Sequence, residues 1–145
     1  PCNLDAWDGY EFERDAVLAY AQQLDSKLVV LAGDTHNAWT AQMTTPDGNI
    51  AGVEFGCTSV SSPGFDGPGL LGPGNAGAFG PLVTDLIDDL RYAGLVGRGY
   101  LHLVFTADNV TATHRFVTTI DSREYAENVA AAKSFVVNRS DMLLS

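Results

Sequence analysis

Residues 28–32, Leu-Val-Val-Leu-Ala, form a run of five apolar residues that passes directly into Gly-Asp-Thr-His. A short apolar run of this composition, ended by glycine, is typical of a buried β-strand. Gly33 has no Cβ and therefore permits a sharp turn after the strand. Residues 34–37 then bring a carboxylate, a hydroxyl, an imidazole and an amide in succession. Polar side chains at the end of an apolar strand are where an α/β enzyme holds a metal ion or a phosphate.

The patterns around this strand predict a single domain, residues 1–145, of the α/β class (α+β, with a mixed sheet). Before the strand, apolar residues recur at helical spacing and acidic residues occupy the first turn, which predicts a helix that ends near residues 25–26. After the polar loop, two alternating segments flank a Pro-Asp-Gly-Asn turn and predict a β-hairpin over residues 38–55. The other predicted elements are a long loop rich in Gly and Pro at 56–81, a helix at 82–91, paired strands at 99–106 and 110–118, a segment at 124–133 that could be helical, and a possible last strand at 134–138.

The net charge limits the partners of this chain. Lys and Arg number 8 and Asp and Glu number 18, which gives a net charge of −10. Such a surface repels nucleic acids and anionic membranes. No segment approaches the ~20 continuous apolar residues that cross a bilayer. We therefore expect neither a nucleic-acid partner nor a membrane span. Cys2 and Cys57 fit either one disulfide or two free thiols.

Asp34 and His36 are the candidate metal ligands. Side chains at i and i+2 of an extended segment point to the same side, so the carboxylate and the imidazole would converge on one cation. Such a pair suits iron, zinc or manganese, whereas carboxylates with carbonyls suit calcium. Two ligands do not complete a site. The alternative interpretation is that Asp34 caps a backbone amide and His36 lies on the surface.

Other polar and aromatic residues allow weaker assignments. Asn37 could ligate a metal or hydrogen-bond a phosphate oxygen. Trp39 is expected to anchor the hairpin, because aromatic rings mostly pack in the core. His102 and His114 fall in the two strands predicted near the C-terminus and are expected on the sheet surface.

Several blocks in this sequence together resemble the C-terminal part of PhoD-like alkaline phosphatases. They occur in the order found in that family and cover most of the chain. The blocks are residues 3–10, 29–36, 53–55 with 59–64, 98–100 and 113–117.

The resemblance implies a metallophosphoesterase-like fold, in which two facing β-sheets are flanked by helices and metals lie at strand ends. This chain would be the C-terminal half of such a sandwich. Members of the family hydrolyse phosphoesters and use iron with calcium. They are usually exported, which implies a secreted or periplasmic protein. The Gly-Asp-x-His block supplies metal ligands there, which carries over to Asp34 and His36. The loop Trp-Asp-Gly-Tyr lies near the active site in such proteins, so Trp7 and Asp8 become candidates for substrate binding.

One departure from the family pattern is informative. The family takes its other ligands from earlier motifs of the Asp-x-His, Gly-Asp-x-x-Asp and Asn-His types, and this chain has none of them ahead of its Gly-Asp-Thr-His block. We therefore expect a portion of a phosphatase that is inactive without its N-terminal half, which a cleaved segment or a second polypeptide would supply. The alternative is a non-catalytic binding or assembly module, because an isolated half-sheet exposes an edge and should self-associate or bind a partner.

Overall fold

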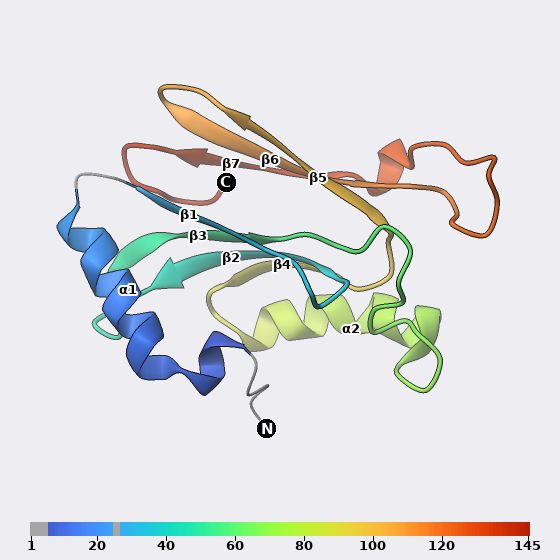
Figure 1. Cartoon of the computed structure of the whole chain (residues 1–145), viewed down its shortest axis with the longest axis horizontal. Coiled ribbons are helices and arrows are strands. Elements are labelled where there is room, and N and C mark those ends of the chain that lie inside the picture. The colour runs from blue at the N-terminus through green and yellow to red at the C-terminus, as the bar shows by residue number, and fades with distance from the viewer. Residues whose placement is uncertain (1–5, 25–26) are drawn as a thin grey trace.

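The protein is built from two β-sheets that face each other, with two helices on one side (Figure 1). This computed structural model describes residues 6–24 and 27–145, except the Asp8 side chain. Cys2 lies outside the described residues, and Cys57 is a free thiol. The elements are η1 (Trp7–Gly9), α1 (Glu11–Gln23), β1 (Leu28–Ala32), β2 (Ala38–Thr44), β3 (Ile50–Gly56), α2 (Gly72–Leu86), β4 (Leu90–Gly94), β5 (Gly99–Phe105), β6 (Asn109–Phe116), η2 (Val129–Ala131) and β7 (Lys133–Asn138).

The first sheet brings the ends of three strands together. Its order is β1-β3-β2-β4, with β1 parallel to β3 and β2 antiparallel to both of its neighbours. Ala32 at the end of β1 pairs with Gly56 at the end of β3, and Gly56 also pairs with Trp39 at the start of β2. The loops that follow β1 and β3 therefore leave the sheet at the same end of the strands. The loop after β1 leads back into the sheet there, at the start of β2.

The core lies between the two sheets. The second sheet has the order β5-β6-β7 and is antiparallel throughout. Buried side chains from β3, β6, β7 and the C-terminal segment form one apolar cluster, namely Val53, Phe55, Ala112, Phe135, Val137 and Met142. His114 on β6 is also fully buried here, 1% exposed, so its predicted surface position is wrong. The reason is register: His114 follows Ala112 on the inward face of β6.

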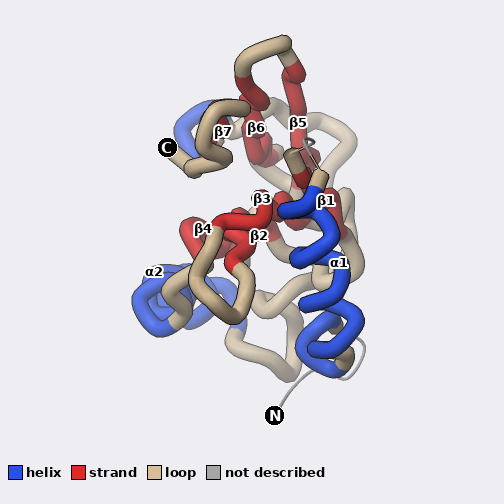
Figure 2. Tube along the Cα trace, turned by 90° about the vertical axis from the view of Figure 1, so that its left-hand side faces the viewer, coloured by secondary structure: helices blue, strands red, loops and turns tan. Residues whose placement is uncertain are grey.

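Both helices cover the face of the first sheet that points away from the second sheet (Figure 2). Leu18 of α1 packs with Met43 and Ala51 in a second apolar cluster. Helix α2 packs against β4 so closely that a Cβ on Gly80 would stand 2.5 Å from the Ala93 carbonyl oxygen. The mixed α/β class and the two-sheet arrangement predicted from the sequence are thereby confirmed. Among the described residues, no helix has the length and apolarity to cross a bilayer.

Two predicted elements were placed wrongly. Helix α2 begins at Gly72, inside the predicted loop at 56–81, and ends at Leu86 rather than continuing to residue 91. Its many Gly residues and its internal Pro81 lower helix propensity, but its buried small residues pack on β4, and this tertiary contact overrides propensity. Residues 90–94 form β4, which extends the sheet beside β2. In the C-terminal tail, only η2 is helical between residues 124 and 133.

Strand β1 differs from the expected buried strand. It lies at the edge of the sheet, because only β3 pairs with it among the described residues. None of its residues is fully buried, and Leu31 is 55% exposed. Parallel strands of this composition are normally covered on both sides. The apolar sequence therefore indicates a more enclosed position than this chain alone provides.

Candidate functional site

The polar loop between β1 and β2 is held in an unusual backbone conformation. Asp34 and His36 both have positive φ angles, 67° and 59°, which are uncommon for residues other than glycine. Gly33 has no positive φ, so the sharp turn expected there falls on the following residues instead. The loop is therefore not an extension of strand β1, and strand alternation does not describe how Asp34 and His36 lie relative to each other.

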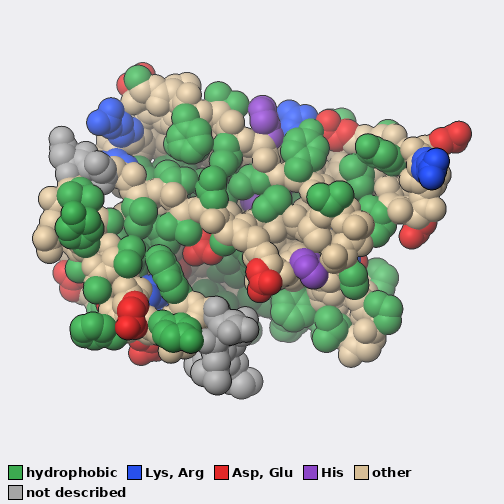
Figure 3. Space-filling model, viewed as in Figure 1, with side chains coloured by type: hydrophobic (Ala, Val, Ile, Leu, Met, Phe, Trp, Pro, Cys, Tyr) green, Lys and Arg blue, Asp and Glu red, His purple; other side chains and the backbone are tan. Residues whose placement is uncertain are grey.

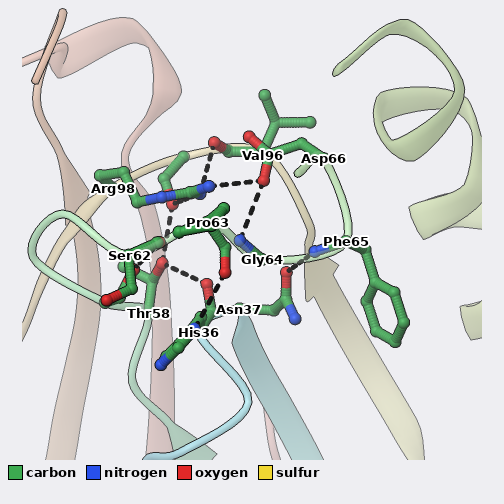
Figure 4. A network of polar contacts seen from close by, with 12 residues as sticks. His36, Asn37, Thr58, Ser62, Pro63, Gly64, Phe65, Asp66, Val96 and Arg98 are labelled. Atoms are coloured by element: carbon green, nitrogen blue, oxygen red, sulfur yellow. Dashed lines mark hydrogen bonds and ion pairs between the residues drawn. The ribbon is translucent and has the colours of Figure 1, made fainter. Parts of the chain in front are cut away.

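The imidazole of His36 is fixed by one hydrogen bond. Its Nδ1 lies 2.9 Å from the carbonyl oxygen of Pro63. A carbonyl oxygen only accepts, so Nδ1 carries the proton and the neutral ring keeps its lone pair on Nε2. The second ring nitrogen points away from the surrounding network (Figure 4). The loop thus presents a histidine nitrogen that is able to bind a metal ion or accept a proton.

The side chain of Asn37 is buried under the loop and holds it by hydrogen bonds. It is only 2% exposed. Its Nδ2 donates to the carbonyl oxygen of Thr35 at 2.5 Å, and its Oδ1 accepts the backbone N–H of Phe65 at 3.1 Å. Both ends of the amide are therefore engaged within the protein. This arrangement gives Asn37 a role in shaping the loop, and a contact with substrate stays a prediction.

The segment after β3 lies against the same loop. The hydroxyl of Thr58 is 3.1 Å from the carbonyl oxygen of His36 and 2.7 Å from that of Gly97. Gly64 lies against the other side, where a Cβ would stand 2.3 Å from Oδ1 of Asn37. Only glycine fits this close approach. Residues 58–64 therefore form the wall against which the His36 loop is folded (Figure 4).

A buried ion pair stands behind this wall. Nη2 of Arg98 is 2.5 Å from Oδ1 of Asp66, and the two side chains are 8% and 14% exposed. The guanidinium also donates to the carbonyl oxygens of Val96 and Gly97. Arg98 and Asp66 border a hollow of about 610 Å³ that residues 92–98 and 116–121 also line, and this hollow does not include Asp34 or His36.

Sequence reasoning did not identify the ion pair as a pair. Its members are separated by 32 residues, and one lies in a segment rich in Gly and Pro. The sequence offered one hint that Arg98 matters. Arg98 directly precedes β5 and lies in block 98–100, one of the blocks that carry the family resemblance. No periodicity connects it to Asp66.

Trp39 and Thr35 close the other side of the loop. The indole N–H of Trp39 donates to Oγ1 of Thr35 at 2.7 Å. The Trp39 ring meets Phe65 edge to face, with centroids 6.4 Å apart. Trp39 is only half-buried and belongs to neither apolar cluster, so it packs beside this loop and not in the core where it was expected.

The remaining candidates are placed differently. Asp34 is exposed, and its carboxylate has no hydrogen-bond or ion-pair partner in the described part of the chain. Trp7 lines a hollow with residues of α1 and the middle of β2 and β3, among them Glu11, Ala41 and Glu54, and is not part of the His36 network. The side chain of Asp8 lies outside the described residues.

No cluster of three or more His, Cys, Asp or Glu side chains that could bind a metal occurs within residues 6–24 and 27–145. Asp34 and His36 therefore offer at most part of a coordination shell. A histidine that donates Nδ1–H to a carbonyl and keeps Nε2 free has the orientation of metal-ligating histidines, and a free carboxylate two residues away is a compatible oxygen donor.

Comparison with known proteins gives concordant results. The family model of the PhoD-like phosphatases matches residues 1–114. The alkaline phosphatase D of Bacillus subtilis (strain 168) is 33% identical over 67 residues, which are 43% of this chain and 12% of that protein. A solved structure described as the structure of PhoD superposes with a TM-score of 0.76 at 24% identity, over 98% of this chain and 26% of that chain. The chain thus spans about a quarter of the similar structure and an eighth of the curated relative.

Proposed function

The chain belongs to the PhoD-like phosphatase family, and from that membership we propose that it is the C-terminal portion of a metal-dependent phosphoesterase catalytic domain. In this proposal Asp34 and His36 supply two of the metal ligands. The family supports phosphoester hydrolysis as the general activity. The substrate class is phosphomonoesters and phosphodiesters, and the site of action is outside the cytoplasm.

The orientation of His36 carries the metal part of the proposal. The Pro63 carbonyl accepts a hydrogen bond from Nδ1–H, which leaves the lone pair of Nε2 free to coordinate a metal ion. Asp34 adds, on the same short loop, a carboxylate that has no partner among the described residues. An imidazole with a carboxylate suits iron, zinc or manganese, and carboxylate oxygen suits calcium. Iron with calcium is the pair that the family resemblance implies.

The residues of this chain would hold the metal and shape the site. A bound metal ion would neutralise phosphate charge and provide an activated nucleophile. Asn37 is buried and hydrogen-bonded at both ends of its amide, so its part in this proposal is to keep the ligand loop folded. Trp7 and Asp8 remain weaker candidates for contact with the ester group.

The sheet edge supports the view that further segments complete the domain. Strand β1 is apolar and parallel to its neighbour, yet it lies at an edge with Leu31 exposed. Strand β5 is also at an edge, and Figure 2 shows β1 and β5 on the same side of the molecule. Hydrophobic side chains gather on that face (Figure 3). We propose that the N-terminal half of the same enzyme covers this side and brings the missing ligands.

The test uses the 145-residue chain. We expect negligible hydrolysis of p-nitrophenyl phosphate, and we expect Zn²⁺ to perturb the ring signals of His36 in NMR spectra. Asp34→Asn should weaken this Zn²⁺ binding, and His36→Gln should remove it as followed by the backbone amide signals of the loop, whereas the control His102→Gln, on an exposed face of β5, should leave it unchanged. Hydrolysis that persists in this chain and falls on Asp34→Ala would contradict the need for a further segment. Zn²⁺ binding that ignores both loop substitutions would contradict the ligand assignment.

A second candidate function is a non-catalytic binding or assembly module. The exposed apolar edge at β1 favours it, because unpaired edge strands pair with other chains. In the first proposal the β1 edge binds the N-terminal half of the same enzyme, and in the second it binds another chain. Self-association of the purified chain would show that the edge is able to bind in either case.

A further inference from the structure

We propose that the buried Asp66–Arg98 ion pair is a positioning device for His36. It fixes one peptide group, between Pro63 and Gly64, whose carbonyl selects the tautomer and orientation of the imidazole. The consequence for metal binding rests on the function proposed above, whereas the positioning itself does not.

The first link is the carboxylate of Asp66. Its Oδ1 accepts Nη2 of Arg98 at 2.5 Å and the backbone N–H of Gly64 at 3.1 Å. Arg98 is itself held by the carbonyl oxygens of Val96 and Gly97, so the guanidinium has little freedom. Because the pair is largely shielded from solvent, its attraction is screened less than that of a surface pair.

The second link is a single rigid peptide unit. The N–H of Gly64 and the carbonyl of Pro63 belong to the same planar group, which is trans. Asp66 holds the N–H side, and Nδ1 of His36 donates to the carbonyl side at 2.9 Å. A hydrogen bond from the N–H to a carboxylate also polarises the peptide and strengthens its carbonyl as an acceptor. The Asp66–Arg98 ion pair and the His36 imidazole are therefore connected through one planar peptide group.

Close packing restricts rotation of that plane. A Cβ on Gly64 would meet Oδ1 of Asn37 at 2.3 Å and the carbonyl oxygen of His36 at 2.9 Å. On the other side, Thr58 bonds the same His36 carbonyl and that of Gly97, next to Arg98. The wall and the loop are thus in contact at several points, and the ion pair lies on the side of Pro63 and Gly64 that is away from His36 (Figure 4).

The arrangement predicts a specific state of the His36 ring. Free neutral imidazole carries its proton mostly on Nε2. The Pro63 carbonyl instead requires the proton on Nδ1 and leaves the Nε2 lone pair outward. Such partners of a ligand histidine typically change metal affinity 10- to 100-fold when they are removed.

The experiment measures the tautomers of the three histidines by ¹⁵N NMR of the ring nitrogens in the full chain without metal. We expect the Nδ1–H form at His36 in the wild type and a shift toward Nε2–H in Asp66→Asn, which removes the charge but keeps a similar shape. His114, buried in the core, reports whether the variant is folded, and exposed His102 is the internal reference. In the same samples, Zn²⁺ affinity at His36 should fall roughly 10-fold.

The matched control is Glu127→Gln. It breaks the Arg115–Glu127 ion pair, whose side chains are each about one-third exposed and which has no hydrogen bond to the His36 loop or its wall. We expect the wild-type tautomer at His36 in this variant. A folded Asp66→Asn with unchanged His36 signals would overturn the proposal.

Two further outcomes are also decisive. If Asp66→Asn does not fold, Arg98→Lys keeps the positive charge and loses the planar fork, and it should shift the His36 tautomer in part. A wild-type His36 that is mainly Nε2–H overturns the proposal without any variant. If the tautomer shifts as expected but Zn²⁺ does not bind at His36 in the wild type, the positioning role stands and the metal-site proposal fails.

Discussion

His114 connects the two sheets at the residue scale. Its Nε2 is 2.8 Å from Oγ1 of Thr40 on β2, and its ring contacts both Tyr92 of β4 and Phe135 of β7, which also contact each other. Burial lowers the pKa of His114 to about 4 and raises the pKa of Tyr92. The only charged group near this cluster that the described contacts identify is Lys133, whose Nζ lies 6.0 Å from the Phe135 ring centroid. The core therefore favours the neutral imidazole.

We expect the free energy of unfolding to decrease as the pH falls from about 6.5 to 4. In that window the unfolded chain protonates His114 whereas the folded chain does not, so protons favour unfolding. The shift corresponds to about 3 kcal/mol between the two ends of the window. Urea unfolding at several pH values measures it, and His114→Gln should remove this part of the pH dependence. Parallel curves for wild type and His114→Gln would contradict the assignment.

At the scale of single elements, α2 shows how packing overrides composition. The helix contains Gly and Pro at many positions and would be weak in isolation. Its two buried residues, Ala76 and Gly80, are small and let the helix backbone approach β4. The contact between helix and strand, not the intrinsic propensity of the segment, therefore maintains α2.

Two glycines of this helix should respond in opposite directions to substitution by alanine. Gly80→Ala should destabilise the protein by about 1–3 kcal/mol, since its Cβ would meet the Ala93 carbonyl oxygen at 2.5 Å. Gly74→Ala is the matched control: nothing lies within 4 Å of its Cβ, so it should stabilise the helix by roughly 0.5–1 kcal/mol. Thermal unfolding of both variants measures the difference, and equal effects would argue against close packing of α2 on β4.

The elements that the sequence predicted well are those with local signals. Alternation around the Pro-Asp-Gly turn predicts the hairpin of β2 and β3. Helical spacing of apolar residues predicts α1, and a continuous apolar run predicts β1. Helix α2 and strand β4 were misplaced because tertiary contacts decide them. In the site, spacing identified Asp34 and His36 as candidates. It did not reveal the orientation of His36, which depends on Pro63, 27 residues away.

At the scale of the whole molecule, the sandwich is open along one side. Edge strands β1 and β5 share that side, and both carry exposed apolar residues, including Leu31, Val104 and Phe105. Native proteins usually protect such edges by charge, by bulges or by a covering segment. Without a covering segment, we expect this chain to associate with itself.

A single charge at the edge should prevent that association. Leu31→Lys places a cation on β1 at a side chain that is already more than half exposed, so the fold should be retained. Sedimentation velocity at several concentrations should show association of the wild type and a monomer for this variant. Leu86→Lys, at an exposed position of α2 away from the edge, is the control and should associate like the wild type. Association of Leu31→Lys equal to that of wild type would place the contact elsewhere.

The strand order determines when, during folding, the loop that carries the candidate ligands takes its shape. The hairpin of β2 and β3 closes through a short turn and can form within microseconds. Strand β1 is made earlier but pairs with β3 alone among the described strands, so it has no strand partner until β3 has been made. The loop that carries Asp34 and His36 acquires its shape only when both of its ends are anchored. The proposed cation-binding geometry is therefore a late product of folding, and a nascent chain that stops before residue 56 would contain both candidate ligands without the folded loop.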